Sequence, residues 1–222
     1  MARAAIKPPL KLAKKPDKPA VPAVPAVPAA PHREGARERI LATAHDLIYR
    51  EGARAVGIDR IVAESGVAKM SLYRWFPSKD DLIVAVLHEQ ERLTWEVWHR
   101  NIERYSGAPL KQLRAQFESL TEVIAHPDTR GCAFLNVAVE LADESHPARA
   151  VVRKHKAELT ERLAELAVDA GLKHPRALAE QLMVVGEGAH AISQSLGKNH
   201  ATSQLMSIVD ALIAAHMPLK RS

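Results

Sequence analysis

Hydrophobic residues recur at helical spacing along the chain from residue 33 onward. In residues 33–51, apolar side chains repeat three and four positions apart, which places them on one face of a helix, and Gly52 follows where that pattern stops. Residues 58–76 contain two shorter helical patterns joined at Gly66, because a glycine tolerates the left-handed backbone of a tight turn. No segment shows the alternation of a strand, so the sequence predicts an all-α fold of about nine helices.

The second of these short helices divides into an inner and an outer face. Its spacing turns Leu72, Trp75 and Phe76 inward and leaves cationic and hydroxyl side chains outside. A helix, a glycine turn and a second helix of this kind are typical of a helix-turn-helix that places its second helix in the DNA major groove.

A long helix is predicted next, because Ser78 is a good N-cap and Asp80 and Asp81 in the first turn suit the helix dipole. It should continue to about Tyr105 and link two domains. Ser145 is the expected cap of a later helix. The remaining helical patterns cover residues 110–125, 132–141, 148–170, 174–197 and 201–216. We therefore expect a DNA-binding domain over residues 33–79 and a larger helical domain over residues 80–222.

The net charge of +5 belongs to the N-terminal tail. Residues 1–32 hold six basic side chains and one acidic side chain, 6 − 1 = +5, so the remainder is neutral overall. A Pro-Ala-Val triplet repeats from Pro19 to Pro28, which blocks helix formation and favours polyproline II. We expect this tail to be disordered, acting either as a solvated spacer or as a basic arm attracted to phosphate.

Several classes of protein lack support in the sequence. The chain has a single cysteine, Cys132, so it forms no internal disulfide, and we expect a cytoplasmic location. No apolar run approaches the roughly 18–20 residues of a membrane span. Metal-ligand spacings, nucleophile elbows and glycine-rich phosphate loops are missing, so we expect no enzyme, no metal and no cofactor.

Residues 65–82 have the sequence SGVAKMSLYRWFPSKDDL, which spans the glycine turn, the second short helix and the start of the long helix. It resembles the signature of TetR-family transcriptional regulators, and the resemblance covers about residues 36–83. The chain departs from that pattern at Gly57 and Ala68, which replace the usual helix caps, and at Met70 and Trp75. The resemblance implies a homodimeric DNA-binding repressor with three N-terminal helices on DNA, a C-terminal ligand pocket and release from DNA when a small molecule binds.

The candidate DNA contacts lie on the second short helix and at the start of the long one. Lysine and arginine bind guanine acceptors, and serine can bond to any base, so Lys69, Ser71 and Arg74 are candidates for base contacts. Tyr73 and Lys79 match positions that hold phosphates in the family. Met70 and Trp75 are further candidates, for operator or backbone contact.

The C-terminal half offers two further candidate sites. Apolar walls with a few polar groups are typical of ligand pockets, although ordinary core packing is the competing interpretation. The pocket candidates are Trp95, Trp98, Phe117, Phe134, Asn136, Glu187 and His190. Apolar stripes on the last two helices predict a four-helix dimer interface. Its candidates are Leu182, Val185, Ala189, Ile192, Leu205, Ile208 and Leu212.

The leading hypothesis is a repressor that leaves a palindromic operator when a small molecule binds. The alternative keeps the DNA-binding fold but removes the sensor, leaving an architectural or partner-gated DNA binder. Effector, operator, regulated genes and the sign of regulation are not encoded in these patterns.

Overall fold

A computed structural model describes residues 35–218, so the expectation of a disordered tail at residues 1–32 lies outside the described residues. The described part contains nine helices and no strand, which confirms the predicted fold class. The helices are α1 (Ala36–Glu51), α2 (Ile58–Ser65), α3 (Lys69–Trp75), α4 (Lys79–Arg104), α5 (Pro109–Ala125), α6 (Ala133–Glu140), α7 (Pro147–Asp169), α8 (Pro175–Ser195) and α9 (Lys198–Ala215).

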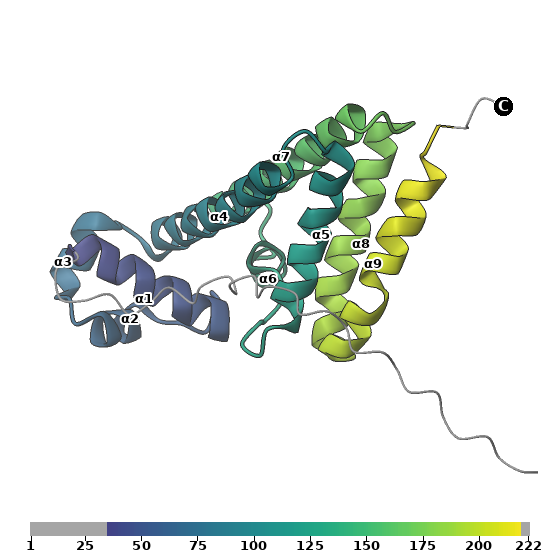
Figure 1. Cartoon of the computed structure of the whole chain (residues 1–222). Coiled ribbons are helices and arrows are strands. Elements are labelled where there is room, and N and C mark those ends of the chain that lie inside the picture. Colours follow the sequence, from purple (N-terminus) through teal and green to yellow (C-terminus); the bar gives the residue numbers. More distant parts are fainter. Residues whose placement is uncertain (1–34, 219–222) are drawn as a thin grey trace, which may run out of the picture.

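The molecule is elongated, with the three short N-terminal helices at one end (Figure 1). Helices α5, α8 and α9 form a bundle at the other end, and the long helices α4 and α7 run between the two ends. The short helix α6 lies between the N-terminal helices and the bundle. Helix α4 therefore does link the two ends, as its predicted length implied.

The helix-turn-helix forms as the sequence predicts. Gly66 adopts a left-handed conformation with φ of 65°, which ends α2 and reverses the chain. Ile61, Val67 and Leu72 are buried against α1, so the two short helices are held by one small core. Helix α1 ends at the predicted place but begins at Ala36, three residues later than expected.

The ends of two helices show how local chemistry sets their positions. Ser78 and Asp81 form a complete capping box at the start of α4, so the predicted cap is confirmed. The predicted cap of α7 is wrong. His146 takes that position and its Nδ1 accepts a hydrogen bond from the Ala148 amide, whereas Ser145 bonds to the Asp143 carboxylate.

The hydrophobic interior consists of two clusters, and the first one crosses the expected domain boundary. It joins the inner faces of α1–α3 and the start of α4 to Phe134 and Val137 of α6 and Val152 of α7. The second cluster fills the bundle, around Leu113, Leu182 and Leu205. The DNA-binding end is thus packed directly on helices of the C-terminal half.

Candidate nucleic-acid interface and effector region

Helix α3 presents its outer face at the tip of the molecule. Met70, Tyr73 and Trp75 are 81%, 40% and 47% exposed, which is unusual for large apolar side chains. Leu72 and Phe76 are buried as predicted, but the inward orientation expected for Trp75 is wrong. Leu72 and Phe76 are four positions apart and share the inner face of α3, whereas Trp75, three positions after Leu72, lies at the edge of that face and stays half exposed.

The predicted base-contacting lysine is already paired within the chain. Lys69 Nζ lies 2.6 Å from Asp59 Oδ1, and both side chains are exposed. The hydrogen bond and charge of Asp59 raise the pKa of Lys69, so this side chain is cationic at neutral pH. Because a carboxylate repels phosphate, Asp59 opposes non-specific DNA binding at the position where Lys69 would approach a base.

The other candidate cations differ in their surroundings. The Arg74 guanidinium is exposed and lies 5.9 Å from the centre of the Trp75 ring. Lys79 Nζ donates a hydrogen bond of 3.3 Å to the backbone oxygen of Arg54, so it ties the turn between α1 and α2 to α4. Ser71 is half-buried. The geometry therefore leaves Arg74 more accessible for a base contact than Ser71.

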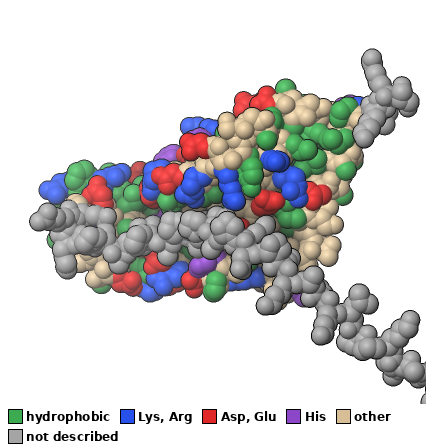
Figure 2. All heavy atoms as spheres, in the orientation of Figure 1, with side chains coloured by type: hydrophobic (Ala, Val, Ile, Leu, Met, Phe, Trp, Pro, Cys, Tyr) green, Lys and Arg blue, Asp and Glu red, His purple; other side chains and the backbone are tan. Residues whose placement is uncertain are grey.

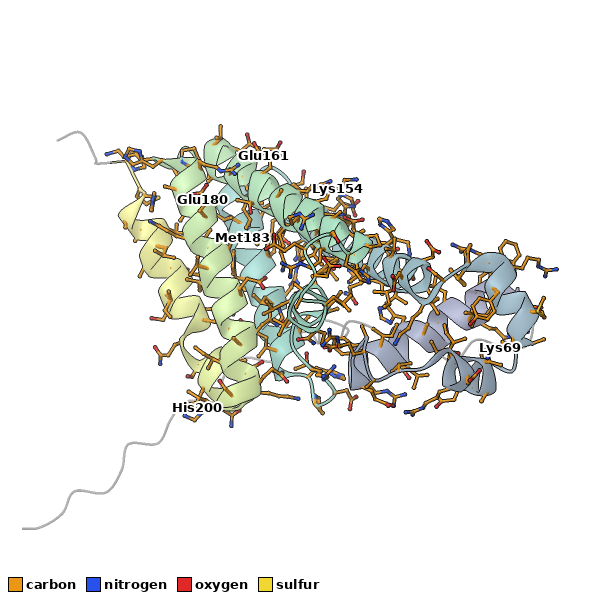
Figure 3. The ribbon with its side chains drawn as sticks, turned by 180° about the vertical axis from the view of Figure 1, so that it is seen from behind. Lys69, Lys154, Glu161, Glu180, Met183 and His200 are labelled. Atoms are coloured by element: carbon orange, nitrogen blue, oxygen red, sulfur yellow. The ribbon has the colours of Figure 1, made fainter. Side chains whose placement is uncertain are left out.

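Charge is mixed on the face of the molecule that Figure 2 shows. Lys and Arg side chains alternate with Asp and Glu over the face shown in Figure 2. Lys69 lies at the end of the molecule opposite Glu180 and His200 (Figure 3). This face therefore carries no broad positive field among its described residues.

The predicted pocket residues are partly brought together, as a packed cluster. Trp95 and Trp98 meet edge to face, with ring centres 6.0 Å apart. Between Trp95 and Phe134 lies His155, a residue that the sequence pattern did not single out. Its ring stacks on Phe134 at 3.8 Å and lies 5.2 Å from Trp95. Phe134 belongs to the first hydrophobic cluster and Trp98 to the second, and His155, which is 2% exposed, lies among these rings. The aromatic cluster therefore links the two hydrophobic clusters.

A charged pair lies beside the aromatic cluster. Lys156 donates a hydrogen bond to Glu187, and its Nζ is also 3.4 Å from Cys132 Sγ and 5.8 Å from the Phe134 ring centre. Burial acts to lower the pKa of Lys156, but its contacts with Cys132 and Glu187 outweigh burial, so the pKa of Lys156 is raised. Polar groups at an aromatic wall make this region the candidate effector site.

His190, half-buried one helical turn from Glu187, feels the charges of Glu187 and Lys156, but two other pocket candidates lie elsewhere. Phe117 is buried in the bundle, where it faces Gly186. Asn136 donates a hydrogen bond of 2.8 Å to the backbone oxygen of Arg130. Neither residue joins the group around Lys156. Sequence reasoning missed His155 and Lys156 because they stand among charged residues on α7 that look like a solvated face.

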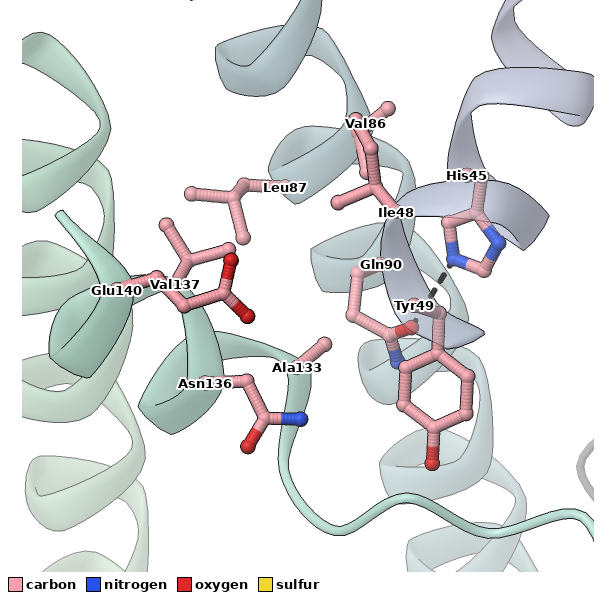
Figure 4. Close-up of a pocket in the computed structure, with 10 residues that line it drawn as sticks. All are labelled: His45, Ile48, Tyr49, Val86, Leu87, Gln90, Ala133, Asn136, Val137 and Glu140. Atoms are coloured by element: carbon pink, nitrogen blue, oxygen red, sulfur yellow. Dashed lines mark hydrogen bonds between the residues drawn. The ribbon is translucent and has the colours of Figure 1, made fainter. Parts of the chain in front are cut away.

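Asn136 lines a small cavity where the DNA-binding end meets α6 (Figure 4). The cavity has a volume of about 10 Å³, which is room for about one water. His45 Nε2 and Gln90 Oε1 lie 3.1 Å apart on its wall and join α1 to α4. This cavity is too small for an effector. It lies among polar side chains where the N-terminal helices contact the C-terminal half, and we call this contact the polar seam.

Hydrogen bonds fasten this seam. The Tyr49 hydroxyl accepts a bond of 2.9 Å from the Arg130 amide and donates one of 3.1 Å to the Gly131 carbonyl. Glu140 accepts a bond of 3.1 Å from the Arg54 amide. Its carboxylate comes so close to Gly52, where φ is 101°, that a Cβ there would lie 2.6 Å from it. We call these contacts of Tyr49, Arg130, Glu140 and Arg54 the junction clasp.

The predicted dimer surface needs correction. Leu182, Ala189 and Leu205 are buried inside one chain, because α5 and α7 cover those faces of α8 and α9. Val185 and Leu212 are half-buried against the same cluster. Of the predicted set, Ile192 and Ile208 remain well exposed, at 41% and 44%. They are accompanied by Leu196, which belongs to the same predicted apolar stripe and is 63% exposed, and by Val184, which was not predicted and is 73% exposed.

The all-helical fold and the exposed outer face of α3 together define a class of protein, the helix-turn-helix DNA-binding regulators. Comparison with known proteins gives the family. Residues 40–86 match the model of bacterial regulatory proteins of the tetR family, and residues 109–209 match a tetracyclin repressor-like C-terminal domain. The chain belongs to the TetR family of transcriptional regulators, and it is not an enzyme.

Solved structures agree over nearly the whole described chain. A TetR-family transcriptional regulator from Streptomyces coelicolor is 33% identical, with a TM-score of 0.78, over 82% of this chain and 95% of its own. A TetR-type regulator from Streptomyces avermitilis is 31% identical, with a TM-score of 0.71, over 82% and 98% of the two chains.

The alignments with curated proteins cover a smaller part of each chain. The HTH-type transcriptional regulator YxaF of Bacillus subtilis is 31% identical over 55% of this chain and 64% of its own. The repressor NemR of Escherichia coli is 24% identical over 53% and 60%. Each alignment thus spans less than two thirds of the curated relative. In the described residues, no helix is long and apolar enough to cross a bilayer.

The buried histidines predict a pH-dependent stability. Burial lowers the pKa of His155 and of His190 to about 4, and the charge of Lys156 acts in the same direction on both. Glu91 acts to raise the pKa of His155, and Glu187 acts to raise that of His190, but neither outweighs burial. Both imidazoles are neutral in the fold but titrate near 6.5 when unfolded, so their stability contribution is present above pH 6.5 and is lost as the pH falls toward 4. Between pH 7 and pH 5, urea denaturation should show a loss on the order of 1–2 kcal/mol per histidine.

Matched variants isolate this effect from the other titrating groups. His155→Gln and His190→Gln should each flatten the dependence of the unfolding free energy on pH between 7 and 5. An exposed histidine, His99, is the control, and His99→Gln should leave the slope as in the parent chain. Equal slopes in all four proteins would show that the buried imidazoles do not titrate in this way.

Proposed function

We propose that this regulator is a dimeric repressor that binds a palindromic operator in the cytoplasm and leaves it when a small molecule binds in the C-terminal half. The observation that carries the DNA-binding part is the exposed face of α3, with Arg74, Tyr73 and Met70 at the tip of the molecule. Helix-turn-helix proteins place this face in the major groove.

Dimer formation is supported by the exposed apolar face of α8 and α9. Val184, Gly188 and Ile192 follow one another at four-residue spacing, and the helix is open at Gly188, where an added Cβ would meet nothing within 4 Å. Apolar side chains in a row beside a small residue favour close approach of a second copy. We therefore revise the interface to Val184, Ile192, Leu196 and Ile208, with Val185 and Leu212 at its edge.

Effector release is supported by the connection between the two halves. The region around Lys156 is continuous with Phe134, and Phe134 lies in the same hydrophobic cluster as α1 and α4. The junction clasp adds polar bonds between α1 and the loop before α6. A molecule that separates Lys156 from Glu187 would displace α6 and, through the clasp, the DNA-binding end.

The alternative function, an architectural or partner-gated DNA binder, rests on a different feature. The aromatic cluster is packed with rings in contact, with His155 filling the space between Trp95 and Phe134. An effector must therefore open it. A thermal-shift screen separates the two functions, because only a sensor is stabilised by a small molecule.

DNA binding is tested at α3. A chain with Lys69→Ala, Tyr73→Phe and Arg74→Ala should bind the duplex upstream of its own gene at least about tenfold more weakly at fixed salt, since a good base contact contributes about 1–3 kcal/mol. Fluorescence anisotropy gives the affinity. Arg176→Ala is the control, because Arg176 is an exposed cation in the bundle, far from α3 and paired with Glu161 and Glu180. Unchanged affinity in the triple variant would refute the α3 interface.

Dimerisation is tested on α8. Ile192→Glu places a charge on the proposed interface and should produce a monomer in analytical ultracentrifugation, with loss of operator binding because one half-site alone binds weakly. Val168→Glu is the control. Val168 is a 59% exposed valine on α7, outside the proposed face, and its variant should remain dimeric. A dimeric Ile192→Glu chain would place the interface elsewhere.

A further inference from the structure

A shallow, open groove lies on the DNA-binding end, between the first turns of α1, the end of α3 and the first half of α4. Its volume is about 460 Å³. The wall is formed by Trp75, Phe76 and Pro77 on one side and by Leu41, Val84 and Ala85 on the other. Trp75 is 47% exposed, so the indole ring presents an apolar surface that this part of the chain leaves uncovered.

The residues that line this groove favour one kind of bound segment. Grooves lined by aromatic rings bind polyproline II segments, because proline rings pack flat on an indole and the segment loses little entropy on binding. Trp75 and Pro77 provide such a surface. The lining also holds His88, the guanidinium of Arg37 and the carboxylates of Asp81 and Glu89, of which Glu89 is already paired with Arg92. Asp81 bonds to Ser78 and leaves a negative charge at the groove, which favours a proline-rich segment that carries positive charge.

The chain contains a segment of this chemistry. Proline occupies every third position from Pro19 to Pro28, and a polyproline II helix has three residues per turn, so these rings would share one edge. The lysines Lys14, Lys15 and Lys18 come directly before the repeat. Their charge is opposite to that of the two groove carboxylates.

The point at which the described chain begins makes the contact possible. Helix α1 begins at Ala36, and Arg37 already lines the groove. Six residues, 29–34, lie between Pro28 and Gly35, and the seven Cα–Cα steps span up to roughly 25 Å in a fully extended chain. The repeat is thus tethered next to the groove, which raises its effective concentration there.

We propose that residues 19–28 of the same chain pack as a polyproline II segment in the groove formed by Trp75, Pro77 and Leu41. Docking holds the basic residues 3–18 beside the end of the recognition helix, so the net charge of the tail acts at the DNA-binding tip. This inference goes beyond the proposed function, because it requires neither an effector nor a particular operator.

The test uses the indole N–H resonances of the full chain. The chain has three tryptophans, Trp75, Trp95 and Trp98, so a ¹⁵N-labelled sample gives three separate signals, and Trp75→Phe identifies the first. Replacing Pro19, Pro22, Pro25 and Pro28 by serine should move the Trp75 signal by more than its line width. The signals of Trp95 and Trp98 should stay in place, because those rings lie in the cluster with His155.

A matched control keeps the repeat intact. Pro8→Ser with Pro9→Ser removes two prolines from the same tail outside the repeat and should leave all three signals in place. The proposal is overturned if the Trp75 signal is the same in the parent chain and in the chain without the repeat prolines. It is also overturned if Trp75 responds to duplex DNA alone and equally in both chains, since DNA would then be the occupant of the groove.

Discussion

The packing of α6 against the DNA-binding helices is the constraint on which the rest of the structure depends. Phe134 and Val137 extend the interior of α1–α4 into the C-terminal half, and Tyr49 and Glu140 add hydrogen bonds across the same seam. Apolar burial makes the contact stable, and the polar bonds fix its geometry, because a misplaced partner would leave the half-buried Tyr49 hydroxyl unsatisfied. A recognition helix held in this way takes its position from the C-terminal half.

On α2 and α3, the placement of charged side chains matters more than the net charge of the protein. Lys69 is balanced by Asp59, and Arg60 is held by Glu64 and Glu51, so much of the charge on α2 and α3 is paired internally. This pairing reduces non-specific attraction to phosphate at α3, and in the proposed interface it leaves Arg74 and its exposed neighbours to contact the bases. The tail carries the charge of +5 separately, and docking beside Trp75 would bring it to the same end of the molecule.

The sequence predicts those features that depend on local periodicity. The helices, the turn at Gly66 and the cap at Ser78 follow from spacing and from side chains within a few residues. Features that depend on distant partners were missed. His155 looks solvated beside Lys154 and Lys156 but is buried between two aromatic rings, and Leu182 looks like a dimer contact because α5 and α7 are not visible in the pattern of α8.

Native-state hydrogen exchange tests the central claim most directly, since it measures whether the two halves open together. Buried amides of α1, such as those of Ala44 and Leu47, should exchange with the same opening free energy and denaturant dependence as those of α6 around Val137. Tyr49→Phe should lower both values together. The account would be contradicted by α1–α3 opening as a separate unit of lower free energy while α6 stays protected and Tyr49→Phe leaves α6 unaffected.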